Sequence, residues 1–171
     1  MLEIRPVIHG DLPALSALAA QTFSETFAHL YSPEDLNAFL DASYAPEKLA
    51  AEMSGDGQFW RIAWDGSTPV GYVQACPVGL PHAEADPSCQ GELKRIYVTA
   101  SHHGRGLGGE LLALALDHLS ARYGDAPQWI GVWSENHRAQ AIYKAQGFKK
   151  VGEYGFKVGA TTDREFILRK G

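Results

Sequence analysis

YVTASHHGRGLGGELLALAL, residues 97–116, decides the fold, because it runs from a strand pattern through four glycines into a leucine-rich helix pattern. The start of a helix leaves about four amide N–H groups without internal partners, and the aligned peptide dipoles place roughly half a positive charge there. Glycines let such a backbone approach a bulky anion without interference from a Cβ atom. The stretch therefore predicts a strand, a phosphate-binding turn and a helix in succession.

The glycines of this turn, together with one cation, are the candidates for holding phosphate groups: Gly104, Arg105, Gly106, Gly108 and Gly109. A mononucleotide P-loop requires GxxxxGK[ST], and its lysine and hydroxyl residue are missing here. A dinucleotide fingerprint requires GxGxxG beside the first strand, whereas this turn lies in the second half of the chain. Neither nucleotide pattern fits the sequence.

Patterns on both sides of the turn predict further strands and helices. Strand patterns occur at residues 2–7, 58–64, 69–76, 91–98, 127–133, 149–158 and 162–170. Helix patterns occur at about 12–28 with Asp11 as the expected N-cap, from Pro33 after Ser32, from Pro46 to about 55, from 104 to about 122, and at 136–148. Residues 79–90 are expected to form a loop. This alternation predicts a mixed α/β domain.

Length and composition indicate one globular domain over residues 1–171, with 45% hydrophobic and 20% charged residues. The N-terminal residues lack the apolar stretch of a secretory signal, and no segment approaches about 18 consecutive apolar residues. We therefore expect a soluble, cytoplasmic protein with no membrane partner. The net charge of −5 argues against a nucleic-acid partner. Residues 1–60 hold two basic and nine acidic residues, which indicates either solvated helix faces or a surface that attracts a cationic substrate.

Two motifs in the second half of the chain resemble those of a known family. His103-Gly104-Arg105-Gly106-Leu107-Gly108 resembles the acetyl-CoA loop of the GCN5-related N-acetyltransferases (GNAT superfamily), which reads Gln/Arg-x-x-Gly-x-Gly/Ala, except that His103 stands at the first position. Asn136-x-x-Ala139-x-x-x-Tyr143-x-x-x-Gly147-Phe148 resembles the second CoA-binding segment of that family. Residues 129–163 and 22–40 are similar to the PaiA-type polyamine acetyltransferases within it.

The resemblance implies a GNAT fold, in which a mixed, mostly antiparallel sheet of about seven strands splays between strands 4 and 5 and carries helices on both faces. It also implies acetyl-CoA as cosubstrate. Its pantetheine arm is expected along the fourth strand and its pyrophosphate on the glycine turn, with a backbone N–H near Val98 stabilising the developing oxyanion. The residues expected to bind it are Ile96, Tyr97, Val98, His103, Gly104, Arg105, Gly106, Leu107, Gly108, Gly109, Asn136, Ala139 and Tyr143.

The resemblance further implies an N-acetyltransferase in which a primary amine attacks the thioester directly in a ternary complex. Tyr143 matches the family tyrosine that protonates the departing thiolate, since a phenol with a pKa of about 10 stays protonated at neutral pH. Glu92 is the candidate base, expected on the same strand face as Lys94 and Ile96. The alternatives are a core role for Tyr143, a solvated or salt-bridged Glu92, and a base formed by a chain of waters.

A small cationic amine such as a polyamine is the expected acceptor, bound by Phe23, Phe27, Tyr31 and Glu34. A protein N-terminus, a lysine, an aminoglycoside and a noncatalytic acetyl-CoA-binding module remain open, and so does a homodimer. Asn136 is expected to cap its helix, to contact pantetheine, or both. No metal site is expected, because His102, His103 and His137 lack a carboxylate at ligand spacing.

Overall fold

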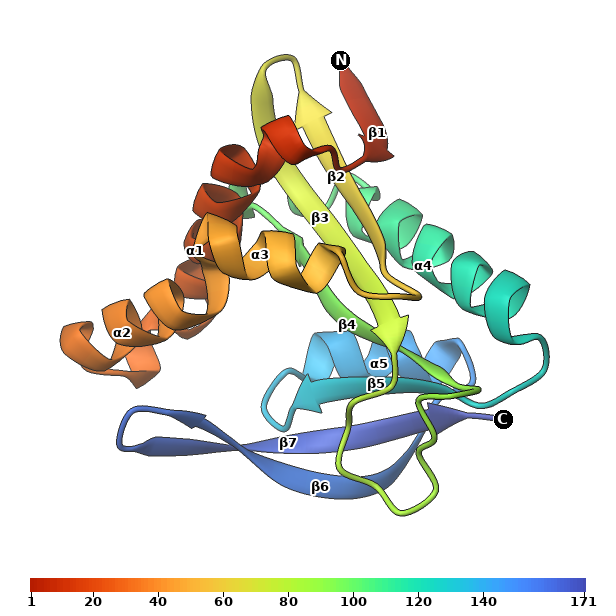
Figure 1. Ribbon diagram of the computed structural model, residues 1–171. Helices are drawn as coiled ribbons and strands as arrows, with labels where there is room; N and C mark the ends of the chain where they lie inside the picture. Colours follow the sequence, from red (N-terminus) through yellow and green to blue (C-terminus); the bar gives the residue numbers. More distant parts are fainter.

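A computed structural model describes residues 1–171. Seven strands form one sheet in the order β1-β2-β3-β4-β5-β7-β6, in which only the neighbours β4 and β5 are parallel (Figure 1). The strands are β1 (Leu2–Pro6), β2 (Phe59–Asp65), β3 (Thr68–Pro77), β4 (Gly91–Val98), β5 (Gln128–Trp133), β6 (Lys149–Val158) and β7 (Thr161–Lys170). Each of them was predicted from the sequence, and the mixed α/β class is confirmed.

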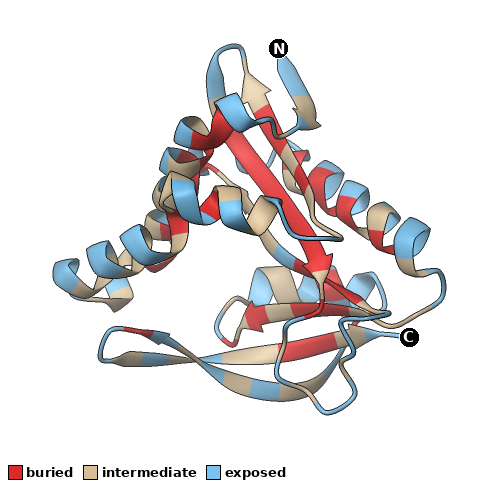
Figure 2. Cartoon of the chain, in the orientation of Figure 1, coloured by how far each residue is buried: buried red, intermediate tan, exposed pale blue.

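Five α-helices cover the two faces of this sheet. They are α1 (Leu12–Phe27), α2 (Pro33–Tyr44), α3 (Pro46–Met53), α4 (Leu107–Tyr123) and α5 (His137–Ala145). Apolar residues of α1, α2 and α3 pack with β2 and β3 on one face, and those of α4 and α5 pack on the other. The buried residues accordingly follow the sheet and the inner sides of the helices (Figure 2). None of these helices is long and apolar enough to cross a bilayer.

The sheet opens between β4 and β5, as expected. Their pairing is confined to Gly91–Leu93 of β4 and Gln128–Ile130 of β5. A β-bulge opposite Gln74 and Ala75 leaves Lys94 as an extra residue on β4, and the splay begins there. Since a bulge bends its strand and adds twist, it turns β4 away from β5. One edge of β4 is therefore free of strand pairing from Lys94 to Val98.

The same bulge corrects the expected orientation of β4. Alternation placed Glu92 on the face of Ile96, but the extra residue reverses the alternation beyond Lys94. Ile96 packs with the α4 side of the sheet, as Leu93 does. Glu92 instead shares the α1 side with Arg95 and Tyr97, since Arg95 binds Glu52 of α3 and Tyr97 packs in the α1 cluster.

One predicted helix start changes, and one predicted N-cap residue uses its side chain differently. α4 begins at Leu107 and not at residue 104, because Gly104 and Gly106 adopt left-handed φ angles of 77° and 82°. Helix α1 begins at Leu12 with Asp11 at the N-cap position, as predicted, but the Asp11 side chain makes no capping hydrogen bond. Its carboxylate accepts hydrogen bonds from Arg5 at 2.7 and 2.8 Å and from the amide of Ile8 at 2.9 Å. This charged side chain therefore joins β1 to the turn before α1.

Candidate active site

A cavity of about 940 Å³ lies where β4 and β5 part. Residues from both faces of the sheet line it: the glycine turn and α5 on one side, and α1, α2, β6 and β7 on the other. The free edge of β4, including Ile96, Tyr97 and Val98, forms part of its wall. Two groups that approach the sheet from opposite faces can therefore meet at the splay.

The glycine turn forms an anion-binding site out of backbone amides. His103 donates its amide to the carbonyl of Ala100, and Glu110 donates to Gly106, but no amide between Gly104 and Gly109 donates to an acceptor within the protein. A Cβ atom at Gly104 or Gly106 would meet nothing within 4 Å, so glycine is required there by the backbone angle and the space in front is open. Unpaired donors at the start of α4 fit a diphosphate group.

Of the two long polar side chains in this turn, His103 and Arg105, only His103 belongs to a residue that lines the cavity. The His103 ring lines the cavity and bonds through Nε2 to the Val98 carbonyl at 2.7 Å, which ties the turn to the end of β4. Arg105 is exposed and lies outside the cavity lining. Arg138, which we did not predict, lines the cavity instead. A cation in the first turn of α5 is unfavourable beside the positive end of the helix dipole. Its presence there in the sequence therefore indicated that an anion binds nearby.

The helix α5 places Asn136, Ala139 and Tyr143 on the cavity wall. Asn136 caps the helix, because its side-chain oxygen accepts the amide of Ala139 at 3.1 Å. Its side-chain NH₂ group makes no hydrogen bond within the protein. Tyr143 is 7% exposed and packs among core residues while it lines the cavity. Burial raises the pKa of its phenol to about 12, so this hydroxyl is protonated at every physiological pH.

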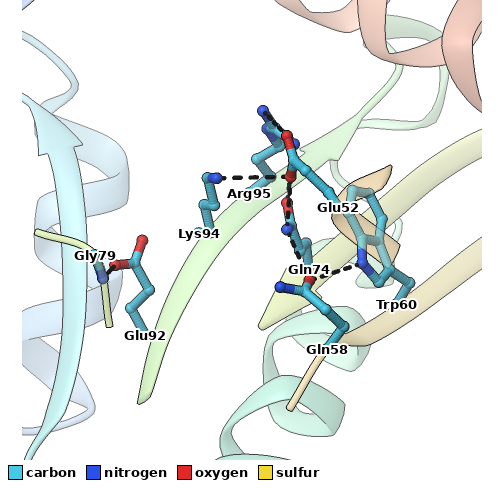
Figure 3. Close-up of polar contacts among 8 residues, drawn as sticks. All are labelled: Glu52, Gln58, Trp60, Gln74, Gly79, Glu92, Lys94 and Arg95. Carbon is cyan, nitrogen blue, oxygen red and sulfur yellow. Dashed lines mark hydrogen bonds and ion pairs between the residues drawn. The ribbon is translucent and has the colours of Figure 1, made fainter. Parts of the chain in front are cut away.

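Glu92 lines the cavity but its carboxylate is already engaged (Figure 3). The side chain is buried, with 5% exposure, and its Oε2 atom accepts the amide of Gly79 at 2.5 Å. Burial raises the pKa of the Glu92 carboxyl, although the amides of Gly79 and Leu80 and the charge of Lys94 oppose this. Glu92 therefore holds the start of the 79–90 loop against β4.

A cluster of polar side chains joins α3 to β4 (Figure 3). Arg95 binds Glu52 at 2.9 and 3.3 Å, Lys94 lies 3.6 Å from the same carboxylate, and Gln74 bonds to both Glu52 and Arg95. Lys94 and Arg95 also line the cavity. Neither residue was predicted from the sequence to belong to the site.

The expected acceptor residues are only partly brought together. Phe23, Phe27 and Tyr31 line the cavity, whereas Glu34 is exposed on the first turn of α2 and lies outside the lining. Helix α2 directs Asp35, and not Glu34, toward the β6–β7 turn, where it accepts the amide of Ala160 at 3.2 Å. Glu34 is therefore not positioned to bind an acceptor inside the cavity.

A second carboxylate on the cavity wall comes from β7 and has no partner in the protein. Glu165 is half-buried on the cavity wall, and neither a hydrogen bond nor an ion pair engages its carboxylate. Burial and the neighbouring charge of Asp163 raise the pKa of the Glu165 carboxyl to about 7. Glu165 was not predicted as a site residue from the sequence. Alternation along β7 puts Glu165 on the same face as Asp163, and this was the missed signal.

Comparison with known proteins identifies similar sequences along nearly the whole chain. A family model described as the acetyltransferase (GNAT) family matches residues 18–148. An uncharacterized N-acetyltransferase of Lactobacillus delbrueckii subsp. lactis is 30% identical over 169 residues, which cover 99% of this chain and 96% of that protein. A spermidine N(1)-acetyltransferase of Thermoplasma acidophilum is 25% identical over 99% of this chain and 96% of its own length.

Solved structures share the fold as well. The crystal structure of the PaiA N-acetyltransferase from Thermoplasma acidophilum in complex with coenzyme A superimposes with a TM-score of 0.76. The alignment covers 99% of this chain and 98% of that one at 23% identity. The order of the strands and the opening between β4 and β5 are thus those of a known architecture.

Proposed function

Since this chain belongs to the acetyltransferase (GNAT) family and is an acyltransferase, we propose that residues 1–171 form one N-acetyltransferase domain whose acceptor is a small cationic amine such as a polyamine. When bound, acetyl-CoA supplies a thioester whose carbonyl carbon an amine can attack. The observation that carries the proposal is the row of unpaired amides from Gly104 to Gly109 beside the opened strand edge. These two features fit a diphosphate and a pantetheine arm, respectively.

In the proposed complex, backbone groups make more of the contacts with acetyl-CoA than side chains do. The amides of 104–109 hold the diphosphate, with Arg138 as the nearby cation. The free edge of β4 at Ile96–Val98 aligns the pantetheine amides, and the side-chain NH₂ of Asn136 is available to the same arm. The acetyl group then lies at the splay, where the acceptor approaches from the α1 side.

The side chains of the cavity fit a direct transfer of the acetyl group from CoA to the amine. Tyr143 stays protonated and donates its proton to the departing thiolate, which needs a donor within hydrogen-bond reach. Cys76 also lines the cavity, but burial raises the pKa of its thiol to about 12, so it is not ionised as a nucleophile would need to be. An acyl-enzyme on cysteine is therefore disfavoured.

A cationic acceptor fits the other side of the cavity. Its wall carries aromatic rings, among them Phe27 and Trp133, whose centroids lie 5.4 Å apart, and the carboxylate of Glu165. Aromatic faces and a carboxylate attract an ammonium group. The relative named a spermidine N(1)-acetyltransferase supports the same acceptor class.

A panel of amines tests this function. The purified chain is incubated with acetyl-CoA and spermidine, spermine, an aminoglycoside, a peptide with a free N-terminus or a blocked peptide with one lysine, and CoA release is measured. We expect the highest kcat/KM with a polyamine, and a rise in Tm with acetyl-CoA that neither NAD nor ATP reproduces. Preference for a peptide would overturn the acceptor class, and no release with any amine would overturn catalysis.

A further inference from the structure

We propose that Glu165, and not Glu92, receives the proton that the acceptor ammonium must lose before its nitrogen attacks the thioester. This inference rests on the proposed function and assigns a residue to its first proton transfer. The two glutamates are the carboxylates that line the cavity, and they differ in what already binds them.

The geometry of β7 directs Glu165 to the acceptor side. It lies opposite Trp133 of β5 and Tyr154 of β6, and cross-strand partners share one face of a sheet. That face carries the aromatic wall of the cavity, since Trp133 packs with Phe27 of α1. Glu165 thus presents its carboxylate where a cation entering beside α1 arrives.

The free carboxylate of Glu165 contrasts with that of Glu92. Glu165 has no hydrogen-bond donor or cation from the protein, whereas Glu92 accepts the amide of Gly79. Protonating Glu92 would weaken a bond that holds the 79–90 loop. Protonating Glu165 breaks no contact within the protein. A base has to gain and lose its proton in each turnover, and Glu165 can do so without local rearrangement.

The groups that face Glu165 are acidic or neutral. Asp163 lies on the same strand, Tyr154 on β6, Tyr97 on β4, and Tyr31 between α1 and α2. Tyr31 donates its hydroxyl hydrogen to the carboxylate of Asp163, so Asp163 is committed to that bond. Its remaining charge acts on Glu165. Together with burial, this brings the pKa of Glu165 to about 7, so about half of the carboxyl groups are ionised at neutral pH and able to take up a proton.

Tyr97 lines the cavity together with Glu165 and Tyr143 and packs in the apolar cluster of α1. Burial is the main cause that raises the pKa of the Tyr97 hydroxyl, and Tyr44, Glu165 and Tyr143 add to it. In the proposed reaction the amine approaches past Glu165, and the thiolate departs toward Tyr143.

The proton and bond changes balance as follows. The acceptor RNH₃⁺ transfers one proton to the Glu165 carboxylate, and the lone pair of RNH₂ forms a bond to the acetyl carbon while the carbon–sulfur bond breaks. The sulfur receives the proton of Tyr143, and the nitrogen gives up a second proton, which restores the phenol. Glu165 then releases its proton to water. The products are RNH–acetyl, CoA–SH and one proton.

Two substitutions with a matched control test the assignment. Glu165→Gln keeps the shape and removes the base, Glu92→Gln does the same at the second carboxylate, and Glu153→Gln makes the same change on the exposed face of β6. With spermidine we expect kcat in E165Q to fall about 10²-fold or more and kcat in E153Q to be unchanged. A Tm shift with acetyl-CoA like that of the wild type verifies that E165Q is folded.

The pH profile separates a base from a structural residue. The base must be ionised, so kcat/KM of the wild type should rise with pH and bend near pH 7. This bend should persist in E92Q and disappear in E165Q. Wild-type kcat with the same bend in E165Q, or loss of the bend in E92Q alone, overturns the proposal.

Carbon-13 NMR of the carboxyl groups gives a readout independent of turnover. We expect one glutamate resonance that titrates near pH 7 in the wild type and E92Q and is missing from E165Q. The presence of that resonance in E165Q overturns the assignment. A wild type that acetylates no amine overturns the proposed function, whereas normal turnover in E165Q overturns the role of Glu165 alone.

Discussion

At the scale of single residues, burial decides which ionisable groups can serve the reaction. Tyr143 and Glu165 line the same cavity, and burial favours the neutral form of each. For a phenol this secures the proton that it has to donate. For a carboxyl group it moves the pKa into the range where a base works at neutral pH. One physical effect therefore suits Tyr143 to the proposed role of acid and Glu165 to the proposed role of base.

Replacing Tyr143 by Phe removes the donor and keeps the ring in the core. We expect kcat to fall about 10²-fold or more while the affinity for acetyl-CoA stays near that of the wild type. Steady-state kinetics and calorimetric titration measure the two quantities. Tyr123→Phe, at the end of α4, is the control and should leave both unchanged. An equal loss of affinity in Y143F would mean that the residue is structural.

At the scale of elements, the start of α4 and the start of α5 form the proposed cosubstrate site. The first is shaped by left-handed glycines and the second by a side-chain cap. Both features are local, because each involves residues within a few positions of one another in the sequence. Their effects on folding and on binding can therefore be separated by substitution.

Replacing Gly106 by Leu tests the amide site of α4. The φ angle of 82° is unfavourable for leucine, and the side chain would fill the space before the amides. We expect a loss of about 1 to 2 kcal/mol of stability and a loss of acetyl-CoA affinity of tenfold or more. Gly66→Leu, at a φ of 61° in the β2–β3 turn, should lose similar stability and no affinity. Thermal unfolding and titration with acetyl-CoA test both variants, and unchanged affinity in G106L would contradict the site.

Substitutions at Asn136 distinguish its role as a helix cap from a role in binding acetyl-CoA. Asn136→Ala should cost about 1 kcal/mol of stability, because the amide of Ala139 loses its acceptor. Asn136→Ser retains a capping oxygen and should recover most of that loss. If the side-chain NH₂ contacts pantetheine, serine restores stability but not the affinity for acetyl-CoA. Recovery of both would assign Asn136 to capping alone, as denaturant unfolding and titration would show.

At the scale of the whole molecule, contacts between segments far apart in the sequence connect the helices to the strand that lines the splay. Glu52 of α3 binds Arg95, 43 residues later, beside the bulge of β4. Burial by itself would raise the pKa of Glu52, but the charges of Arg95 and Lys94 outweigh it, so the pKa is lowered. Helix α3 is thus tied to the strand whose free edge lines the cavity.

Replacing Glu52 by Gln should cost about 2 to 3 kcal/mol of stability at pH 7, since Arg95 then lacks its counter-charge. A lowered pKa means that this stabilisation is present above the unfolded pKa of about 4.3 and is lost as the pH falls through the folded value. The difference between wild type and E52Q should therefore shrink from pH 7 toward pH 3. Urea unfolding at several pH values measures it. Glu47→Gln, exposed on the same helix, should change stability by less than about 0.5 kcal/mol, and a constant difference for E52Q would contradict the ion pair.

The sequence by itself determined the order of the elements, the glycine turn before α4 and the placement of Asn136 and Tyr143 on α5. These features follow from hydrophobic periodicity, helix caps and backbone angles, all of which act within a few residues. Even the family resemblance lies in such short motifs. The start of α4 was misplaced by three residues, because the left-handed angles of its glycines become definite only in the folded turn.

Only the tertiary structure decided which carboxylates face the cavity and remain free of partners. One extra residue at Lys94 reversed the alternation of β4 and put Glu92 under the loop amides. The register of β7 against β5 and β6 brought Glu165 to the cavity, while the first turn of α2 left Glu34 in solvent. Strand pairing joins residues far apart in the chain, and a shift of one position turns every later side chain to the other face. A short sequence pattern therefore does not determine which face of the sheet these side chains occupy.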